Sequence, residues 1–583
     1  MCPSPLAVLA PLASLGRSSA LALGVLLGSG VAPAAAQAGD FDPAAYGDVW
    51  IHDVDQAALH WLTAQGIDVQ SRQGRDALLY ATGDEVARLV SLGFQATPLP
   101  KAGAATKAAW PTFAELTAQL QTLAAANPAI FELSSLGKSV QGRELWMMRV
   151  TDNLQLEEDE PELRYISTMH GDEVVGMQLC LELLEDIAAN YGSDPQIDAL
   201  VDDAELWILP LMNPDGYVAG SRYNAQGFDL NREFPDRVSD PVNDPAGRPI
   251  EVQHVMNWGY QHTPVLSANF HGGALVVNYP YDSAADPWAA YAATPDDQLF
   301  IASSLVYSQL NGPMFSNPVF PQGITNGVEW YAVTGGMQDW NYEWQGCNDV
   351  TIELSNTKWP AFSTIPGFWA DNRASMLAYL ELGFRGVRGL VTDAVTGQPL
   401  DASVTVDGNP HAVYTDPEVG DYHRLLLDGT YDLTVSAPGY QPATVAGVAV
   451  AGPQATVVDV ALTPGGSGPV PDIDVNGQDG PLTVSSGAVS QLTIGLDPAG
   501  QAGVVHDWWI TVTNGSATFY YSLPGSWSPV PQPAYVGGLL PLAGFPLFSG
   551  PLPPGSWTLT MAVDAPDGVY QGTHADTVDV TSL

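Results

Sequence analysis

Helical and strand-like patterns alternate along residues 108–383 of this 583-residue chain. Residues 112–126 and 175–192 carry apolar side chains at helical spacing, whereas residues 163–169 and 348–354 are short and largely apolar. Apolar runs of that length are typical of strands that are buried on both faces of a sheet. The alternation therefore predicts an α/β domain in which helices flank a central sheet.

The segment before this domain predicts a separate small unit, as expected for a chain too long for one hydrophobic core. Residues 41–100 alternate strand-like and helix-like patches, which predicts an α+β unit. The sequence KAGAATKAA at 101–109 is rich in small residues and predicts a flexible linker. Lys101 and Lys107 are expected to be exposed to proteases there.

The composition changes at residue 384, where short alternating strands are separated by Gly, Pro and Asp turns. That spacing predicts an all-β sandwich at 384–463. The sequence GGSGPVP then marks a linker, and the β-rich remainder predicts a second sandwich module. The expected domains are 1–38, 39–107, 108–383, 384–463 and 464–583.

Residues 1–38 have the three parts of an export signal. Arg17 precedes the apolar run ALALGVLLGSGVA, and the small residues APAAAQA follow it, which predicts cleavage after Ala36 or Ala38. The apolar run is too short to span a bilayer comfortably, and no other segment of the sequence is long and apolar enough. We therefore expect a signal peptide and a secreted protein, extracellular or periplasmic, with no membrane span.

The net charge of the chain limits the classes of partner that it is expected to bind. With 19 Lys and Arg against 64 Asp and Glu, the formal net charge is −45. A field of that sign repels nucleic acid and anionic lipid, so neither is expected as a partner. The charge is compatible with attraction of basic peptides, and also simply with high solubility outside the cell.

The stretch TMHGDEVVG contains His170, Asp172 and Glu173, but H-x-x-E arises often by chance. The predicted strands add two further groups, because His271 follows one apolar run and Glu353 lies near the end of another. Ligands of open α/β sheets bind beyond the carboxyl ends of strands, so these groups are expected to converge. Two histidines and Glu173 leave a fourth metal position for water, as in catalytic zinc sites. Asp172 is expected to be a loop residue, because a fourth protein ligand would exclude that water.

Ordered blocks of sequence carry a family resemblance, namely WPTFAELTAQL, LGKSVQGRELWMMRV, MHGDEVVG, LMNPDGY, SRYNAQGFDLNREFPD, LSANFHGGALVVNYPYD, NGVEWYAVTGGMQDWNY and VTIELSNTKWP. The α/β domain resembles the zinc carboxypeptidases, and most of all their regulatory N/E branch (carboxypeptidases N, E, M and D). The resemblance implies a mixed twisted sheet flanked by helices. The module at 384–463 resembles the transthyretin-like, or regulatory-like, domain of that branch. The N-terminal unit resembles a propeptide only in size and texture, and the last module resembles no family.

The resemblance also implies the chemistry of a metallocarboxypeptidase, a protease that hydrolyses the C-terminal peptide bond. One Zn²⁺ per chain is expected on His170, Glu173 and His271, where it would polarise the scissile carbonyl and activate a water molecule. Glu353 is expected to act as the general base. Arg222 is expected to stabilise the developing oxyanion.

Substrate contacts follow from the same blocks. Asn231 and Arg232 are expected to bind the free C-terminal carboxylate of a peptide, which a planar guanidinium suits. Tyr331 resembles the mobile tyrosine that bonds the same carboxylate or the substrate amide. Asp282 and Gln338 match positions that point to terminal Lys or Arg, because a buried acid left without a cation is penalised.

Two other functions remain open at this point. The same fold could prefer apolar or cell-wall peptides, and a comparison of substrates ending in Arg and in Phe would separate these. Alternatively, the chain could be a surface-binding protein without activity, although such a protein is expected to have lost a ligand or the base, and none is lost here.

The flanking units and the remaining reactive side chains are less informative. The N-terminal unit could cap the active site until it is cleaved, aid folding, or be a permanent domain. The aromatic residues of the last module could form a sandwich core or bind a cell surface or polysaccharide: Trp508, Trp509, Tyr520, Tyr521 and Trp527. Cys180 and Cys347 could form a disulfide or be buried thiols. The eight remaining histidines, His423 among them, have no recognisable ligand spacing and are interpreted as structural or surface residues.

Overall fold

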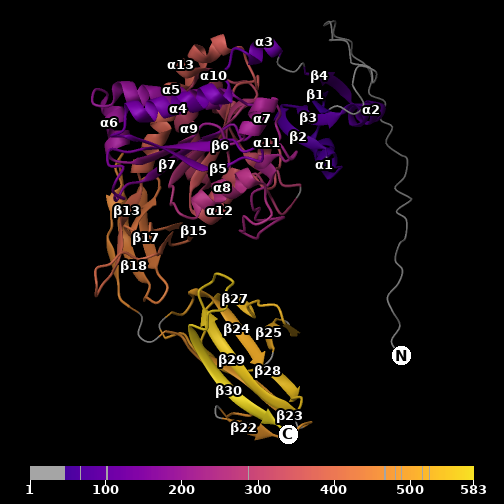
Figure 1. Ribbon diagram of the computed structural model, residues 1–583, viewed down its shortest axis with the longest axis vertical. Helices are drawn as coiled ribbons and strands as arrows, with labels where there is room; N and C mark the ends of the chain where they lie inside the picture. Colours follow the sequence, from indigo (N-terminus) through magenta and orange to yellow (C-terminus); the bar gives the residue numbers. More distant parts are fainter. Residues whose placement is uncertain are drawn as a thin grey trace.

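A computed structural model describes residues 46–65, 67–99, 103–286, 288–464, 468–478, 481–487, 489–499, 501–514, 517–523 and 525–583. The predicted signal peptide at 1–38 and Lys101 lie outside these residues. Along the described chain, a small N-terminal unit is followed by a large α/β domain and two β modules (Figure 1). No described helix combines the length and the apolar composition that a bilayer crossing requires.

The N-terminal unit is a four-stranded antiparallel sheet with two helices. Its sheet order, β2-β3-β1-β4, is that of a split β-α-β fold. The elements are β1 (Tyr46–His52), α1 (Gln56–Ala64), β2 (Asp68–Gln73), β3 (Asp76–Thr82), α2 (Gly83–Ser91) and β4 (Gln95–Pro98). The predicted α+β unit is thus present, but the sequence patterns did not indicate β2.

The α/β domain is built on an eight-stranded mixed sheet of order β11-β10-β12-β9-β7-β8-β6-β5. Its centre, β12-β9-β7-β8, is parallel, and antiparallel pairs flank that centre on both sides. The strands are β5 (Phe131–Lys138), β6 (Glu144–Val150), β7 (Glu162–Ser167), β8 (Glu205–Leu209), β9 (Leu266–His271), β10 (Leu275–Tyr279), β11 (Ile324–Asn326) and β12 (Asn348–Leu354). The mixed sheet confirms the predicted fold class.

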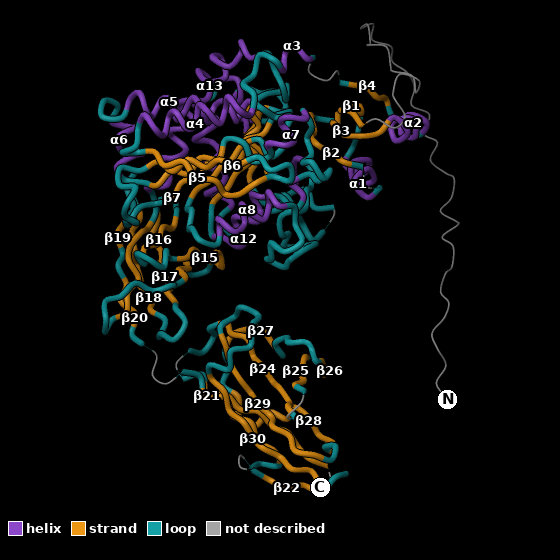
Figure 2. The backbone as a smooth tube through the Cα atoms, in the orientation of Figure 1, coloured by secondary structure: helices purple, strands orange, loops and turns teal. Residues whose placement is uncertain are grey.

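Helices cover both faces of this sheet (Figure 2). One face carries α4 (Phe113–Ala126), α5 (Val175–Asn190), α9 (Asp297–Leu310) and α13 (Ile365–Leu380), and the other carries α8 (Ile250–Gly259) and α12 (Met337–Gln345). Shorter helices are α3 (Ala104–Lys107), α6 (Pro195–Asp202), α7 (Pro214–Ala219), α10 (Gly312–Phe315) and α11 (Gly327–Trp330). Every residue of the four central parallel strands is buried between these layers, which explains their apolar sequences.

The segment between the N-terminal unit and the α/β domain differs from its prediction. Part of the expected flexible linker forms α3, and the ammonium group of Lys107 lies 4.7 Å from the centre of the Trp359 ring. This cation–π contact holds Lys107 against the domain. Lys107 is therefore only partly exposed, and the small-residue pattern carries no sign of the tryptophan that it contacts.

The first β module is a sandwich of two four-stranded sheets, as predicted. Its strands are β13 (Val387–Asp393), β14 (Ser403–Val406), β15 (Asn409–Tyr414), β16 (Asp421–Arg424), β17 (Gly429–Ser436), β18 (Ala443–Val450), β19 (Thr456–Val457) and β20 (Val460–Leu462). The module docks on the α/β domain through Arg424, whose Nη2 donates to both carboxylate oxygens of Asp296 at 2.8 Å. The ring of His411 stacks on Tyr342 with centroids 3.9 Å apart.

The last module also forms two sheets, with a shared apolar core. The strands are β21 (Val470–Val475), β22 (Leu482–Val484), β23 (Val489–Asp497), β24 (Val505–Thr513), β25 (Thr518–Ser522), β26 (Ser526–Ser528), β27 (Tyr535–Gly538), β28 (Leu542–Pro551), β29 (Gly555–Asp564) and β30 (His574–Ser582). Trp508, Trp509 and Tyr521 are buried, whereas Trp527 is exposed.

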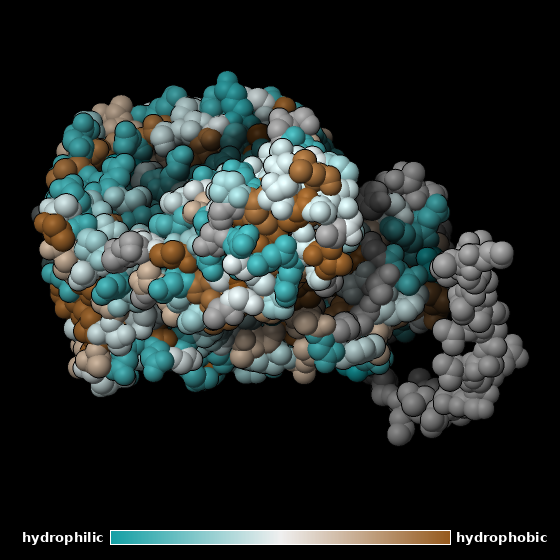
Figure 3. Space-filling view, turned by 90° about the horizontal axis from the view of Figure 1, so that it is seen from below, coloured by the Kyte–Doolittle hydropathy of each residue, from teal (hydrophilic) through white to brown (hydrophobic). Residues whose placement is uncertain are grey.

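Apolar patches on the surface viewed from below are small and separated by hydrophilic side chains (Figure 3). Elsewhere, Cys180 and Cys347 are buried free thiols.

Candidate active site

Three predicted ligands meet at the carboxyl ends of β7 and β9. His170 and Glu173 lie in the loop after β7, and His271 is the last residue of β9. Oε2 of Glu173 lies 2.9 Å from Nδ1 of each histidine, and the two Nδ1 atoms are 3.0 Å apart. All three side chains are buried. The loop and the strand thus bring together groups that are far apart in the sequence.

The donor set fits a divalent cation. Two imidazole nitrogens facing one carboxylate oxygen and each other have too few protons for every contact to be a hydrogen bond. Two histidines and one glutamate are the ligands of many catalytic zinc sites. The far nitrogen of His170, Nε2, lies 2.9 Å from Oδ1 of Asp229, the arrangement that orients metal-binding histidines. These three residues therefore form a zinc-ligand triad.

Glu353 is held beside this triad by the sheet. β12 and β9 are parallel, and their register places Glu353 opposite His271. Glu353 is buried and its Oε2 has no hydrogen-bond partner among the described residues. Burial, with the charge of Glu173 added, raises the pKa of the Glu353 carboxyl well above its usual range. A buried acid with a free oxygen next to a metal site is suited to proton transfer.

Arg222 is oriented by a residue that the sequence patterns did not single out. Its Nε donates to Oδ2 of Asp229 at 2.8 Å, and its Nη1 donates to Oε1 of Glu173 at 3.1 Å. Asp229 therefore contacts both a predicted metal ligand and the predicted oxyanion group. It belongs to the block SRYNAQGFDLNREFPD, but a single aspartate in a loop has no spacing that reveals such a role.

Asn231 and Arg232 lie together in a short 3-10 helix (Leu230–Arg232), and they line a small cavity together with the two histidines and Glu353. Oδ1 of Asn231 accepts a hydrogen bond from the backbone N–H of Met337 at 3.0 Å. Nη1 of Arg232 donates to the carbonyl of Asn231 at 3.0 Å. The guanidinium is therefore positioned in part by the backbone of its own helix.

Asp282 also lines this cavity. Its Oδ1 accepts hydrogen bonds from Gln338 at 2.8 Å and from Asn278 at 3.0 Å. Burial raises the pKa of the Asp282 carboxyl to about 7, with these two hydrogen bonds acting against the rise. The backbone N–H of Asp282 donates to Oδ1 of Asp339 at 2.9 Å, which fixes the loop. The structure thus places Asp282 and Gln338 in contact; both are buried, and Asp282 is the one of the two that lines the cavity.

The N-terminal unit closes the mouth of this cavity with β2. The hydroxyl of Tyr331 donates to the carbonyl of Gln70 at 2.7 Å, and Nη2 of Arg232 donates to the carbonyl of Val69 at 3.2 Å. Trp330 donates through Nε1 to the carbonyl of Arg72 at 2.6 Å. The space left between β2 and the site residues is only about 20 Å³.

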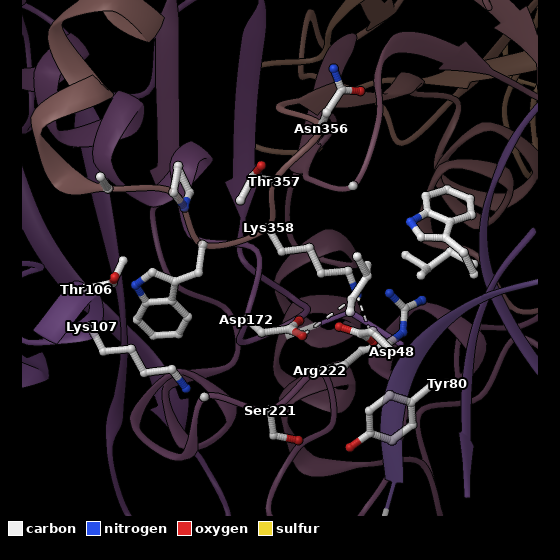
Figure 4. Close-up of a pocket in the computed structure, with 18 residues that line it drawn as sticks. Asp48, Tyr80, Thr106, Lys107, Asp172, Ser221, Arg222, Asn356, Thr357 and Lys358 are labelled. Atoms are coloured by element: carbon white, nitrogen blue, oxygen red, sulfur yellow. Dashed lines mark ion pairs between the residues drawn. The ribbon is translucent and has the colours of Figure 1, made fainter. Parts of the chain in front are cut away.

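A wider cavity of about 500 Å³ continues along the same boundary (Figure 4). Lys358 reaches into it from the α/β domain and lies 3.7 Å from Oδ2 of Asp172 and 3.8 Å from Oδ1 of Asp48. Its ammonium also contacts Oε1 of Gln70. Asp172 is therefore paired with Lys358, whose ammonium also lies 3.6 Å from Oε1 of Glu173.

Comparison with known proteins agrees with the assignment of the zinc-ligand triad. Residues 116–375 match the family described as zinc carboxypeptidase, and residues 386–463 match the carboxypeptidase regulatory-like domain. The chain is 44% identical over 355 residues to carboxypeptidase D of Homo sapiens, a match covering 57% of this chain and 25% of that protein. It is 39% identical over 376 residues to the carboxypeptidase N catalytic chain of Mus musculus, covering 58% and 82%.

A third relative, carboxypeptidase M of Mus musculus, is 38% identical over 346 residues, and the match covers 56% of this chain and 77% of that protein. The chain thus spans about a quarter of the length of carboxypeptidase D but most of carboxypeptidases M and N. The ligand triad, the two matched domains and these identities agree with the resemblance inferred from the sequence blocks. The chain belongs to the zinc carboxypeptidase family, in its N/E branch, and carries the regulatory-like domain of that branch.

Proposed function

We propose that this protein is an exported, zinc-dependent carboxypeptidase that releases C-terminal Arg or Lys from peptides and is kept latent by its N-terminal unit. One observation supports this most strongly. One small cavity is lined by the metal-ligand histidines, by Glu353, by Arg232 and by Asp282.

The cavity suits the end of a peptide. A free C-terminal carboxylate pairs with the Arg232 guanidinium and the Asn231 amide, and Tyr331 can add a hydrogen bond once β2 has left. An internal peptide bond has no carboxylate to offer these groups. The grip therefore selects for the last residue of a chain and makes the enzyme an exopeptidase.

The side chains around the scissile bond have separate tasks. Zn²⁺, when bound by the triad, polarises the scissile carbonyl and makes a water molecule acidic. Glu353 accepts a proton from the attacking water and delivers it to the leaving amine nitrogen. Arg222, held by Asp229, places a fixed positive charge where the carbonyl oxygen becomes negative. Because Asp229 fixes this guanidinium in advance, little reorganisation is needed during the reaction.

Asp282 supports the preference for basic residues. A terminal Lys or Arg brings a cation to the buried carboxylate, which then ionises and forms a charge-assisted hydrogen bond. An apolar terminal side chain would bring no cation to Asp282, and a buried carboxyl without a counter-ion carries a free-energy penalty. A same-fold enzyme for apolar ends would not need an acid in this position.

Latency follows from what β2 contacts. Arg232 and Tyr331, the groups proposed to hold a substrate carboxylate, are bonded to the backbone carbonyls of Val69 and Gln70. The carbonyls provide the oxygen atoms that a substrate carboxylate would otherwise bring. Even a dipeptide therefore has to displace β2 before it can bind.

Export is proposed from the signal-like residues 1–38, and its test is the N-terminal sequence of the released protein, which should begin at Gln37 or Gly39. The activity is tested by comparing intact protein with protein cleaved between the N-terminal unit and Trp110. Blocked dipeptides ending in Arg, Lys and Phe are the substrates, and cleaved Glu353→Gln protein is the control.

We expect the cleaved enzyme to release Arg and Lys far faster than Phe, and the intact chain to be nearly inactive on all three substrates. Equal activity of intact and cleaved protein would rule out latency. Preference for Phe would rule out the assignment of Asp282. Activity that survives in Glu353→Gln would rule out the general base.

A further inference from the structure

A second group of metal-ligating side chains lies between the α/β domain and the first β module. Asp159 comes from the loop between β6 and β7, and Asp421 and His423 come from β16. Each of the three offers a ligand atom, and these atoms all lie within 4.8 Å of one another. Asp421 and His423 are two positions apart on one strand, so both side chains face the same side, toward Asp159.

Two carboxylate oxygens in this group lack a donor. Nε2 of His423 lies 3.0 Å from Oδ2 of Asp421 and 3.8 Å from Oδ1 of Asp159. Oδ1 of Asp159 is buried without a hydrogen-bond partner among the described residues, and so is Oδ1 of Asp421, a residue only 4% exposed. A buried carboxylate oxygen without a donor is costly, and a cation removes that cost.

The surroundings leave negative charge to be balanced. Arg388 lies 3.3 Å from Oδ2 of Asp159 and supplies one positive charge. Glu160 and Asp203 line an adjoining cavity of about 180 Å³, which Asp159 and His423 also line. Such a cavity has room for several water molecules, each of which takes about 30 Å³ in the liquid. Protein ligands and the waters of a metal coordination shell can therefore be present together.

We propose that Asp159, Asp421 and His423 bind a second divalent transition-metal cation of the zinc class, which ties the regulatory-like module to the α/β domain. One imidazole with two carboxylates favours Zn²⁺ or Mn²⁺, whereas Ca²⁺ takes oxygen ligands. Because the three ligands come from both domains, the complete binding site forms only when the module is docked. This site is independent of the proposed peptidase activity, since it shares no residue with the His170 triad.

The test is metal stoichiometry of the intact chain after removal of all metal and reconstitution with Zn²⁺ alone. We expect two Zn²⁺ per wild-type chain and one in Asp159→Asn and in Asp421→Asn. These substitutions lie in different domains and conserve shape, so loss of the same ion from both identifies a shared site. Asp401→Asn, at an exposed position of the same module, is the control and should keep two ions.

A double variant, His170→Ala with His271→Ala, keeps this test separate from the proposed activity. It should be inactive and still bind one Zn²⁺, which Asp159→Asn then removes. With Co²⁺ in place of Zn²⁺, the visible absorption of that double variant should disappear when His423→Ala is added. A wild-type chain that binds one Zn²⁺, and a double variant that binds none, would overturn the second site and leave the catalytic one unaffected.

Discussion

Glu353 and His271 lie opposite each other in the parallel ladder between β12 and β9. The proposed general base and one metal ligand are therefore held at a fixed separation by backbone hydrogen bonds between central strands. Both strands are buried along their whole length, so neither can shift without disturbing the core. Precise placement of a base relative to a metal site thus follows from the register of one strand pair.

Glu353→Gln keeps the shape of the side chain and removes its ability to accept a proton. We expect kcat of the cleaved enzyme to fall by about a hundredfold to ten-thousandfold, the usual contribution of a general base. Zinc content should not change, because Glu353 is not a ligand. Loss of zinc from this variant would mean that the residue acts on the metal site instead.

Asp229→Asn should weaken metal binding without removing a ligand. The carboxylate that orients His170 would become an amide, and loss of such a partner costs about 10- to 100-fold in metal affinity. Competition for Zn²⁺ with a chromogenic chelator measures this change. Unaltered affinity together with reduced kcat would instead assign Asp229 to the positioning of Arg222 alone.

Asp282→Asn should change the preference for the terminal residue. Removing one partner of a buried charge pair costs at least about 2 kcal/mol, so kcat/KM for substrates ending in Arg should fall at least about thirtyfold. Substrates ending in Phe should lose nothing or gain. Asp286→Asn, at an exposed position in the following loop, is the matched control and should behave as the wild type. An equal loss on both substrates would contradict a specificity role.

Asp68→Asn should loosen the N-terminal unit. Its carboxylate accepts a hydrogen bond from Tyr223 and its charge faces Arg222. Hydrogen bonds to charged groups contribute about 1.5 to 3 kcal/mol, so the intact chain should gain about tenfold or more in basal activity. The cleaved enzyme should be unaffected. Asp84→Asn, at an exposed position at the start of α2, serves as the control; a gain in that variant would show that the effect is not specific to β2.

His411 should make the docked module sensitive to acid. Burial, with the charge of Arg424 added, lowers the pKa of His411 from 6.5 to about 3. Between these values the unfolded chain binds a proton that the folded chain does not, so the free energy of unfolding decreases as the pH falls. His411→Phe keeps a ring against Tyr342 and removes this contribution.

The variant should therefore lose less stability than the wild type between neutral pH and about pH 5, by about 2 kcal/mol. Denaturant unfolding at several pH values measures the difference. Parallel curves for the two proteins would show that folding does not lower the pKa of His411.

The sequence predicts the parts of the site that lie on regular, buried strands. His170 and His271 could be found because each follows an apolar run, and such runs end at one edge of a sheet. Asp229 could not be found in the same way, since a loop residue has no periodicity. The contact between Lys107 and Trp359 was missed for a similar reason, because the two residues are distant in sequence.

β2 shows a different limit of prediction from sequence patterns. Its sequence, DVQSRQ, has no alternation of apolar and polar residues, although its central residues are buried. Val69 packs in the apolar core of its unit, but Gln70 and Ser71 are polar although buried, and Gln70 lines the site cavity, so the usual signal of a half-buried strand is absent. Local patterns therefore failed at a strand whose polar residues line a binding site rather than a core.

The contacts of β2 also couple ligand binding to displacement of the N-terminal unit. Any molecule that occupies Arg232 and Tyr331 competes with Val69 and Gln70 for the same donors, so its affinity for the intact chain is lowered by the stability of the closed form. Because this coupling is reciprocal, a sufficient concentration of free arginine or another product would displace the N-terminal unit from the active site. The segment before Trp110 would then be exposed to proteolysis. The enzyme would then mature faster where its own products accumulate.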